Sequence, residues 1–172
     1  MSDWSLRLAR GSDAESFPSI EASASRLFDT VEGLGGIAGQ HTIPVERLRR
    51  CIAKGHCLVA LSGERLVGFL VNEPFSRELH LWEFDVHSKF QQQGIGAGLM
   101  RACQIDARNC GFRALTLTTF REVPWNAPFY ERLGFVEIAD VASHPRLHDE
   151  IEKEVAHGLP RERRCAMICF LD

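Results

Sequence analysis

The sequence has 172 residues, of which 45% are hydrophobic and 25% charged, and its formal net charge is −3. This length predicts a single domain over residues 1–172, since domains most often contain about 100–150 residues. The slightly acidic balance argues against a nucleic-acid partner, which usually requires a basic face. No uncharged apolar run reaches the ~18–20 residues that span a bilayer, and residues 1–13 lack the features of a secretory signal. We therefore expect a soluble cytoplasmic enzyme or binding domain, with no membrane and no nucleic-acid partner.

The six cysteines form no CxxC pair and have no zinc-type spacing with the seven histidines. We interpret them as small buried side chains, without disulfides and without a metal. Cys110 is included in this interpretation, because it continues the apolar stripe of a predicted helix. His144 and His148 stand four residues apart, but no acidic metal motif surrounds them, so we interpret both as solvated.

Hydrophobic periodicity predicts the elements in chain order. Ser12-Asp13-Ala14-Glu15 is typical of a capping box and predicts the start of a helix that runs towards Phe28. Four glycines at 33, 35, 36 and 39 then predict a loop. The other predicted elements are strands at residues 5–9, 56–61, 65–72, 78–86, 114–119, 135–139 and 164–171, helices at 44–53, 93–111 and 126–133, and a narrow helical stripe of Leu147, Ile151 and Val155. This order predicts one mixed α/β domain.

The central feature is a glycine-rich turn between the strand at 78–86 and the helix at 93–111. Glycines in such a turn allow a ligand to approach the backbone, and free N–H groups at a helix start suit a diphosphate. A tight turn without a ligand is the alternative. Gly94, Gly96 and Gly98 give GxGxG, which differs from the dinucleotide motif GxGxxG, and no Gly-Lys-Ser/Thr of a nucleotide P-loop is present.

Two motifs together resemble those of the GNAT N-acetyltransferases. The first is Gln91-x-x-Gly94-x-Gly96, which is similar to the acyl-CoA pyrophosphate motif of that family. The second is Val-Pro-Trp-Asn-Ala-Pro-Phe-Tyr-Glu-Arg-Leu-Gly-Phe at residues 123–135. The resemblance extends over essentially the whole chain. It implies a mixed, mostly antiparallel central sheet, flanked by helices and splayed at its middle strands, with acetyl-CoA as cosubstrate and no metal.

The resemblance also implies which residues hold acetyl-CoA. The turn would wrap the pyrophosphate, the end of the strand would pair with the pantetheine arm, and the second motif would line the pantetheine and its thiol. For Asn126 the alternative is a helix N-cap, and for Phe129 and Tyr130 it is a place in the core. The implied binding residues are Phe84, Asp85, Val86, Gln91, Gln92, Gln93, Gly94, Ile95, Gly96, Ala97, Asn126, Phe129 and Tyr130.

Two residues are predicted to be catalytic. Tyr130 is the only tyrosine and matches the general-acid position of the family. Full proton transfer from a tyrosine to a thiolate is uphill by roughly 2 kcal/mol at ordinary pKa values, so Tyr130 either has a lowered pKa or acts by hydrogen bonding. Glu83 is the predicted base, because acids are unusual on a strand expected to be covered on both sides; Asp85 or a chain of waters is the alternative.

We expect acetyl transfer from acetyl-CoA to a primary amine, on a small molecule or a protein, by direct attack in a ternary complex. A non-catalytic acyl-CoA-binding or sensor domain is the alternative. In this family, segments 17–40 and 141–160 build the acceptor pocket, and their acids would suit a cationic acceptor unless they form a solvated face. The family is often dimeric through its last strands, which leaves a homodimer open. The acids are Glu21, Asp29 and Glu32 in the first segment and Asp149, Glu150, Glu152 and Glu154 in the second.

Overall fold

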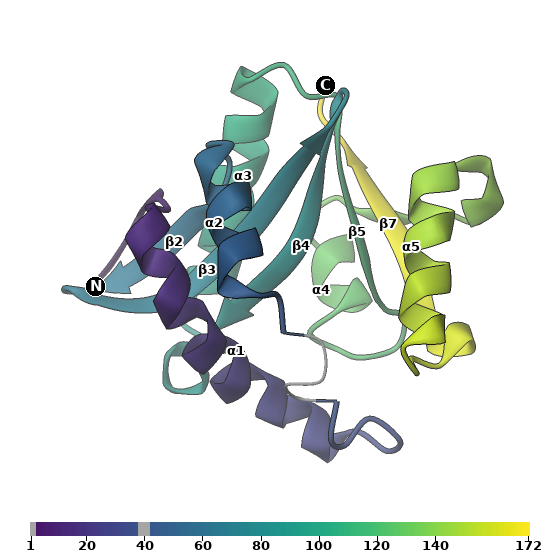
Figure 1. Cartoon of the computed structure of the whole chain (residues 1–172), viewed down its shortest axis with the longest axis horizontal. Helices are drawn as coiled ribbons and strands as arrows, with labels where there is room; N and C mark the ends of the chain where they lie inside the picture. Colours follow the sequence, from purple (N-terminus) through teal and green to yellow (C-terminus); the bar gives the residue numbers. More distant parts are fainter. Residues whose placement is uncertain (1–2, 38–41) are drawn as a thin grey trace. The chain divides into compact units, whose positions relative to one another are not determined.

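The computed structural model describes residues 3–37 and 42–172 and has a mixed α/β fold (Figure 1). The strands follow the order β1-β2-β3-β4-β5-β7-β6, in which the β4–β5 ladder is parallel and the ladders β1–β2, β2–β3, β5–β7 and β6–β7 are antiparallel. This mostly antiparallel sheet with flanking helices confirms the predicted fold class. The strands are β1 (Trp4–Leu8), β2 (Leu58–Ser62), β3 (Arg65–Phe75), β4 (Glu78–Val86), β5 (Ala114–Phe120), β6 (Val136–Glu137) and β7 (Arg164–Phe170). The α-helices are α1 (Phe17–Ser25), α2 (Val45–Ala53), α3 (Ile95–Asn109), α4 (Ala127–Glu131) and α5 (Pro145–Ala156), and the 3₁₀ helices are η1 (Gly11–Ser16), η2 (Arg26–Thr30), η3 (Ser88–Phe90), η4 (Val141–Ser143) and η5 (Arg161–Arg163).

The chain divides into two compact units, each described here by itself. The first unit comprises Met1–Pro74 and Trp82–Asp106, and the second comprises Phe75–Leu81 and Ala107–Asp172. The first unit therefore holds β1, β2, most of β3 and the end of β4. The second holds the start of β4 and everything after the last turn of α3.

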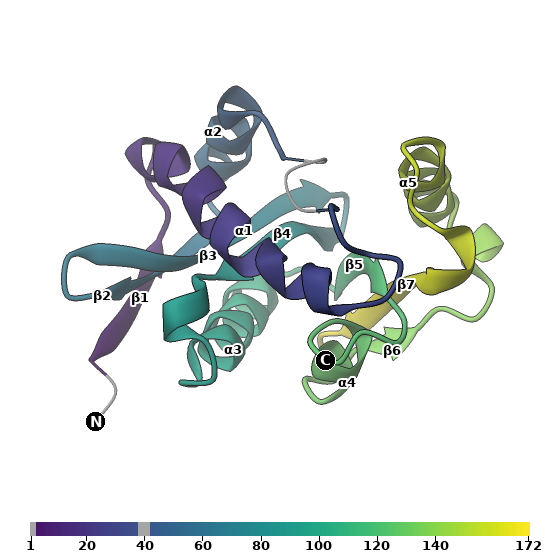
Figure 2. The same ribbon diagram turned by 90° about the horizontal axis from the view of Figure 1, so that it is seen from below.

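In the first unit, helices cover both faces of the strands. Helices α1 and α2 lie on one face of β3 and β4, and α3 lies on the other (Figure 2). The rings of Phe17 on α1 and Phe69 on β3 stack with centroids 4.1 Å apart. Burying aromatic rings of this size contributes about 2 kcal/mol each. The core beneath α1 and α2 consists of Ala14, Phe17, Ile20, Leu48, Cys51, Ile52, Cys57, Val59, Phe69 and Val71.

In the second unit, β4 contributes only a short ladder. Residues Glu78–His80 of β4 pair with Ala114–Thr116 of β5, which is three of the nine residues of β4 within the described chain. Such a brief ladder agrees with the predicted splay of the middle strands. Strand β5 pairs along its whole length with β7, and α5 packs Leu147 and Ile151 against Ala166 of β7.

Three sequence predictions are wrong in detail. Ser12 does not cap the first helix, because the Asp13 carboxylate takes that role and accepts hydrogen bonds from Arg10 N–H and Arg7 Nη1, both at 2.7 Å. Cys110 is exposed, since α3 ends at Asn109 and the apolar stripe ends with it. His144 is not merely solvated, because its Nε2 lies 2.9 Å from the carboxylate of Glu78.

Gly39 and Gln40, at the end of the predicted loop and of the first acceptor segment, lie outside the described residues. Among the described residues, none of the helices combines the length and the apolar character needed to cross a membrane.

Candidate functional site

The predicted phosphate-binding turn joins β4 to α3 in the first unit. Gln92 and Gly94 both have positive φ, 61° and 84°, which turns successive N–H groups outward. Phe90 N–H donates to His87 O at 2.8 Å, and the next backbone donor along the chain with a carbonyl acceptor is Gly98 N–H, which donates to Gly94 O at 2.9 Å. In the part of the chain that the structure describes, the N–H groups of residues 92–97 have no backbone acceptor. Free N–H groups at the positive end of a helix are the kind of backbone arrangement that suits an anion.

Side chains of the turn hold it in shape. Gln91 Nε2 donates to Val86 O at 2.9 Å, which ties the first glutamine of the motif back to the end of β4. Gln93 Nε2 donates to Lys89 O at 3.4 Å, whereas the Gln92 side chain is exposed. Gln91 therefore acts on the shape of the turn, and the N–H groups are left to face a ligand.

Basic side chains surround the start of the turn, a feature that the sequence reasoning missed. Burial and the charges of Arg65, Lys89 and Arg26 together lower the pKa of His87. The Arg65 guanidinium lies 5.4 Å from the centroid of the Phe90 ring. Arg26 and Arg65 are distant in sequence from the glycine motif, so no spacing rule could have associated them with it.

The third glycine of the turn has a packing role. A Cβ atom at Gly98 would lie 2.6 Å from Cη2 of Trp4 on β1, which is well inside van der Waals contact. Gly94 has no such neighbour and is required for its positive φ. The two glycines therefore have different roles. Gly98 leaves room for the Trp4 indole, and Gly94 allows the backbone conformation of the turn.

Glu83 and Asp85 form a carboxyl pair near the end of β4. They are two residues apart on the strand, so their side chains leave the same face, and each carboxyl shifts the pKa of the other. Burial and the Asp85 charge raise the pKa of Glu83 well above its usual range, and burial raises the pKa of Asp85 to about 7. Two coupled carboxyls with raised pKa values titrate as a unit.

One oxygen of this pair is unsatisfied. Asp85 Oδ2 is buried and accepts no hydrogen bond from the described residues. A buried acceptor without a donor is costly, so this atom marks a place where a donor from outside the chain would be stabilised.

A third acid lies near the pair on α1. The charge of Glu21 contributes to the raised pKa values of both Glu83 and Asp85, and burial raises the pKa of Glu21 itself. On the same helix, Ser23 Oγ lies 2.8 Å from Ser88 Oγ and accepts from Ser88 N–H at 3.1 Å, directly after β4. This contact joins residues 65 positions apart, so periodicity gave no signal for it.

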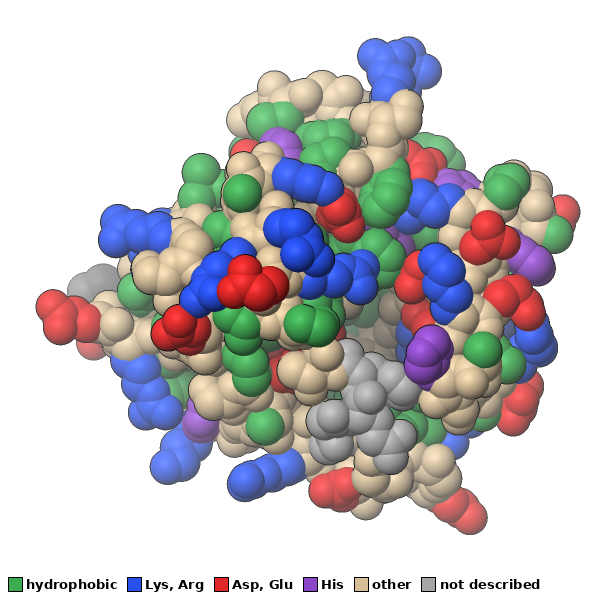
Figure 3. Space-filling model, in the orientation of Figure 1, with side chains coloured by type: hydrophobic (Ala, Val, Ile, Leu, Met, Phe, Trp, Pro, Cys, Tyr) green, Lys and Arg blue, Asp and Glu red, His purple; other side chains and the backbone are tan. Residues whose placement is uncertain are grey.

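The cations on α2 and directly after it have partners other than these three acids. Lysine and arginine side chains gather over α2 (Figure 3). There Arg47 lies 4.6 Å from the Trp82 ring centroid, Arg49 pairs with Glu15, and Lys54 pairs with Glu73. The carboxyl groups of Glu21 and of the pair have no ion-pair partner among the described residues.

In the second unit, Asn126 stands at the N-cap position of α4 but does not cap it with its side chain. Its backbone oxygen accepts from Phe129 N–H and Tyr130 N–H at 2.9 and 3.1 Å, while its Nδ2 donates to Trp125 O at 3.3 Å. Its Oδ1 is buried and has no donor among the described residues. The capping alternative therefore explains the backbone of Asn126 and leaves its side-chain oxygen available.

Tyr130 is held in an aromatic cluster of the second unit. Its ring packs edge-to-face against those of Phe129 and Phe135, each with centroids 5.5 Å apart. Gly134, with φ 95°, ends the α4 segment and returns Phe135 N–H to Tyr130 O at 3.1 Å. The Leu-Gly-Phe part of the second motif thus fixes the ring of Tyr130, which is 7% exposed.

The acids of the second predicted acceptor segment have cation partners. Glu154 Oε2 accepts from Arg164 Nε at 3.0 Å, and Glu152 Oε2 accepts from Arg161 Nη2 at 2.8 Å. Glu150 lies 3.6 Å from Lys153. The fourth acid, Asp149, is exposed and lies 3.8 Å from His148, so three of the four acids of this segment have a lysine or arginine partner.

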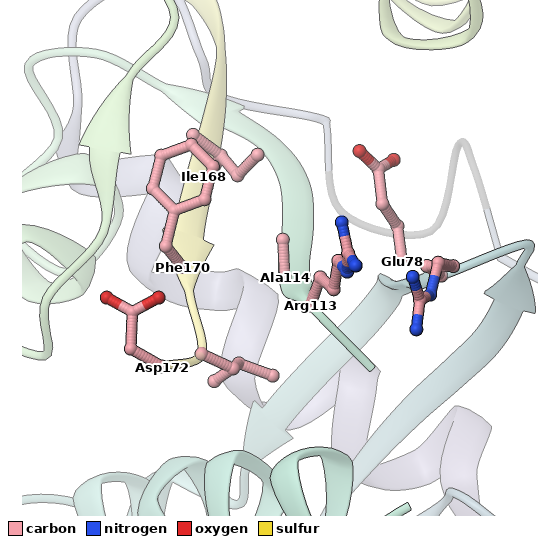
Figure 4. A pocket seen from close by; sticks show the side chains of 8 residues that line it. Glu78, Arg113, Ala114, Ile168, Phe170 and Asp172 are labelled. Carbon is pink, nitrogen blue, oxygen red and sulfur yellow. The ribbon is translucent and has the colours of Figure 1, made fainter. Parts of the chain in front are cut away.

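A surface hollow of about 540 Å³ in the second unit lies where β5 begins and β7 ends (Figure 4). Arg113, Ile168 and Phe170 contribute to its lining. None of the predicted site residues lines it.

The structure thus places the predicted site residues in two groups. The base, the strand end Phe84–Val86 and the turn are in the first unit. Asn126, Phe129 and Tyr130 are in the second.

The sheet, the glycine turn and the helix that follows it define the class of acyl-CoA-dependent acetyltransferases. Residues 53–137 match the family of the acetyltransferase (GNAT) domain. This match identifies residues 53–137 as an acetyltransferase (GNAT) domain, in agreement with the two motifs.

Solved structures share this fold. PaiA N-acetyltransferase from Thermoplasma acidophilum, in complex with coenzyme A, has a TM-score of 0.73 at 13% identity, over 97% of this chain and 98% of that chain. The ribosomal-protein-S18-alanine N-acetyltransferase from Escherichia coli has a TM-score of 0.67 at 13% identity, over 98% and 94%. The structure of yncA from Salmonella typhimurium, with its cofactor acetyl-CoA, has a TM-score of 0.66 at 17% identity, over 99% and 95%. At these identities the similarity is one of fold.

Proposed function

We propose that this protein transfers the acetyl group of acetyl-CoA to a primary amine by direct attack in a ternary complex. The observation that carries the proposal is the Glu83–Asp85 carboxyl pair, which lies on β4 immediately before a turn of free N–H groups. A protein that only bound acyl-CoA would need the turn but not a pair of carboxyls held at high pKa.

For acetyl-CoA binding, the N–H groups of the turn would hold the pyrophosphate, with Arg65 and Lys89 adding positive charge. The end of β4 would pair with the pantetheine arm. The unsatisfied Asn126 Oδ1 suits an amide N–H of the pantetheine, and Phe129 and Tyr130 would line the thiol end.

Amine activation falls to the carboxyl pair. An alkylamine has a pKa of about 10.4, so roughly one molecule in a thousand is neutral at pH 7. A base with a pKa near the working pH is the most effective one, and the raised pKa of Asp85 meets that condition. Because the two carboxyls are coupled and titrate together, the pair as a unit replaces Glu83 alone as our proposed base.

The chemical steps then balance. The amine nitrogen attacks the thioester carbon, its proton passes to the carboxyl pair, and the C–S bond breaks. Backbone N–H groups near residues 84–86 are proposed to stabilise the oxyanion of the tetrahedral intermediate, and Tyr130 is proposed to donate a hydrogen bond or a proton to the departing sulfur.

The test is a thiol-release assay with acetyl-CoA against amino acids, polyamines, aminoglycosides and peptides. We expect release above the rate of spontaneous hydrolysis with at least one amine, and its loss on changing Glu83→Gln together with Asp85→Asn. Calorimetric titration with CoA provides the control. CoA binding without thiol release across the panel would instead support the non-catalytic acyl-CoA-binding domain.

A further inference from the structure

Three side chains of the kinds that bind metal ions meet at the C-terminal end of α3. His56 precedes β2, Asp106 lies near the end of α3, and Cys110 directly follows that helix. Each contributes one donor atom, a ring nitrogen, a carboxylate oxygen and a sulfur, and these three atoms all lie within 4.8 Å of one another. His56 and Asp106 are 50 positions apart in the sequence, so no spacing motif could have indicated this group.

The positions of the three ligands are fixed by the structure around them. Asn72 on β3 is 1% exposed, and its Nδ2 donates to His56 O at 2.9 Å and to Cys103 Sγ at 3.2 Å. One buried amide therefore joins the backbone of His56 to α3, three residues before Asp106. The boundary between the two units falls after Asp106, inside α3. Cys110 comes only four residues later at the end of the same helix, so the helix itself places the two side chains side by side.

The three donor types match a zinc ion. Imidazole, thiolate and carboxylate are the ligands that Zn²⁺ takes in proteins, with bonds of about 2.0–2.3 Å. Tetrahedral bonds of this length place the ligand atoms roughly 3.3–3.7 Å apart. His56 Nδ1 lies 3.0 Å from Asp106 Oδ2, and a movement of the Cys110 side chain by about 1 Å would bring its sulfur to the required spacing. Mg²⁺ and Ca²⁺ prefer oxygen ligands and match this group less well.

The thiol of this group is accessible from solvent. All six cysteines belong to the described part of the chain, and Cys110 is exposed whereas the other five are buried. The cysteine that a metal ion could reach from solution is therefore the one beside an imidazole and a carboxylate. A hydrogen bond or ion pair between His56 and Asp106 would account for those two side chains but gives no reason for a thiol beside them.

We propose that His56, Asp106 and Cys110 bind one Zn²⁺ ion, with water as the fourth ligand. The ion would link the segment before β2 to the end of α3 and so stabilise the first unit. Asp106 is eleven residues from the start of α3 at Ile95, or about 17 Å along the helix axis, so the ion would not contact the glycine turn. This inference is independent of the proposed function, whose chemical steps use no metal.

The experiment titrates the full, metal-free chain with Co²⁺ and then with Zn²⁺. We expect one equivalent of Co²⁺ to give a thiolate-to-cobalt charge-transfer band together with the visible bands of a tetrahedral ion, and one equivalent of Zn²⁺ to remove both. As a second measurement, Zn²⁺ should slow the alkylation of Cys110 by iodoacetamide about tenfold or more, because a metal-bound thiolate is a weaker nucleophile. Peptide mass spectrometry identifies the alkylated cysteine.

Four variants test the ligands one by one. Cys110→Ser should abolish the charge-transfer band and lower the affinity for Zn²⁺ about 100-fold, and His56→Gln or Asp106→Asn should lower it about tenfold or more. Cys110→His replaces the thiolate by another zinc ligand, so we expect it to bind Zn²⁺ within about tenfold of the wild type but without the band. His148→Gln is the matched control, because His148 lies 3.8 and 3.9 Å from two acids of α5 with no place in the proposed site, and it should bind like the wild type.

The two changes at Cys110 separate a loss of ligand from a loss of folding, since Cys110→His should restore the binding that Cys110→Ser removes. A Co²⁺ spectrum without a charge-transfer band, or a band that persists in Cys110→Ser, would overturn the inference. Equal losses of affinity in His56→Gln and His148→Gln would overturn it as well, by showing nonspecific binding to surface histidines. Alkylation of Cys110 at the same rate with and without Zn²⁺ would reduce Cys110 to an ordinary surface thiol.

Discussion

Two carboxyl sites, one in each unit, have opposite surroundings. In the first, Glu83 and Asp85 have no ion-pair partner among the described residues, and burial raises the pKa of both. In the second, Glu78 accepts from Arg146 Nη2 at 2.8 Å and lies 2.9 Å from His144 Nε2. Burial would raise the pKa of Glu78, but these two partners lower it overall. The charged form of Glu78 is thus stabilised by cationic partners, whereas the charged forms of Glu83 and Asp85 have no such partner among the described residues.

The largest expected effect removes the uncompensated pair. Changing Glu83→Gln together with Asp85→Asn should lower kcat by about 10³-fold, because general-base catalysis contributes about 10²–10⁴-fold. Each single change should cost nearly as much, since groups that act as a unit are not additive. Steady-state thiol release measures this, with Glu64→Gln, at an exposed glutamate in the β2–β3 turn, as the control. A double variant with wild-type kcat would show that the pair, like Glu78, has only a structural purpose.

The next prediction concerns whether the second unit supplies chemistry as well as structure. Tyr130→Phe keeps the ring in its aromatic cluster and removes only the hydroxyl, so we expect kcat to fall about 10²-fold. The affinity for acetyl-CoA, measured by calorimetry, should change by no more than about twofold. Unchanged turnover would remove Tyr130 from the mechanism and leave the second unit a structural role.

The third prediction concerns Glu78, the acid that has cationic partners. Glu78→Gln should lower the free energy of unfolding by about 3 kcal/mol, because breaking a part-buried ion pair leaves Arg146 without its charge partner. Because the pKa of Glu78 is lowered in the folded state, its stabilisation is present above the usual glutamate pKa and is lost as pH falls below it. Urea unfolding at neutral and acidic pH measures both effects. Equal stability of variant and wild type at neutral pH would contradict the assignment.

The smallest expected effect is a change in stability with pH in the opposite direction to that of Glu78. The raised pKa values of Glu83 and Asp85 mean that the folded state holds protons which the unfolded state releases. The wild type should therefore lose stability as pH rises from about 4 through neutrality. The Glu83→Gln, Asp85→Asn variant should lack this loss and exceed the wild type by about 1 kcal/mol at pH 8, the value being modest because both residues retain some access to water. A variant less stable than the wild type at that pH would show that the two carboxyls contribute to the fold.

The sequence by itself determined the order of elements, the family and both motifs. These features are local: apolar periodicity selects helix or strand, and a glycine turn needs residues with positive φ within a few positions of one another. The bounds of β4 and the existence of the turn at Gly94 follow from that periodicity and spacing. The sequence also indicated Glu83 as a candidate base, because an acid is unusual on a strand expected to be covered on both sides.

Only the tertiary structure decided how the acids are used. Glu154 has a cation partner because β7 brings Arg164 Nε to 3.0 Å from its carboxylate, whereas Glu21 on α1 has no ion-pair partner among the described residues. The same limit explains why Cys110 and His144 were misjudged, because exposure and partners depend on where a helix ends and what packs beside it. A pKa depends on burial and on charges in space, so the sequence could name the candidate carboxyls, and only the fold could separate the reactive ones from the structural ones.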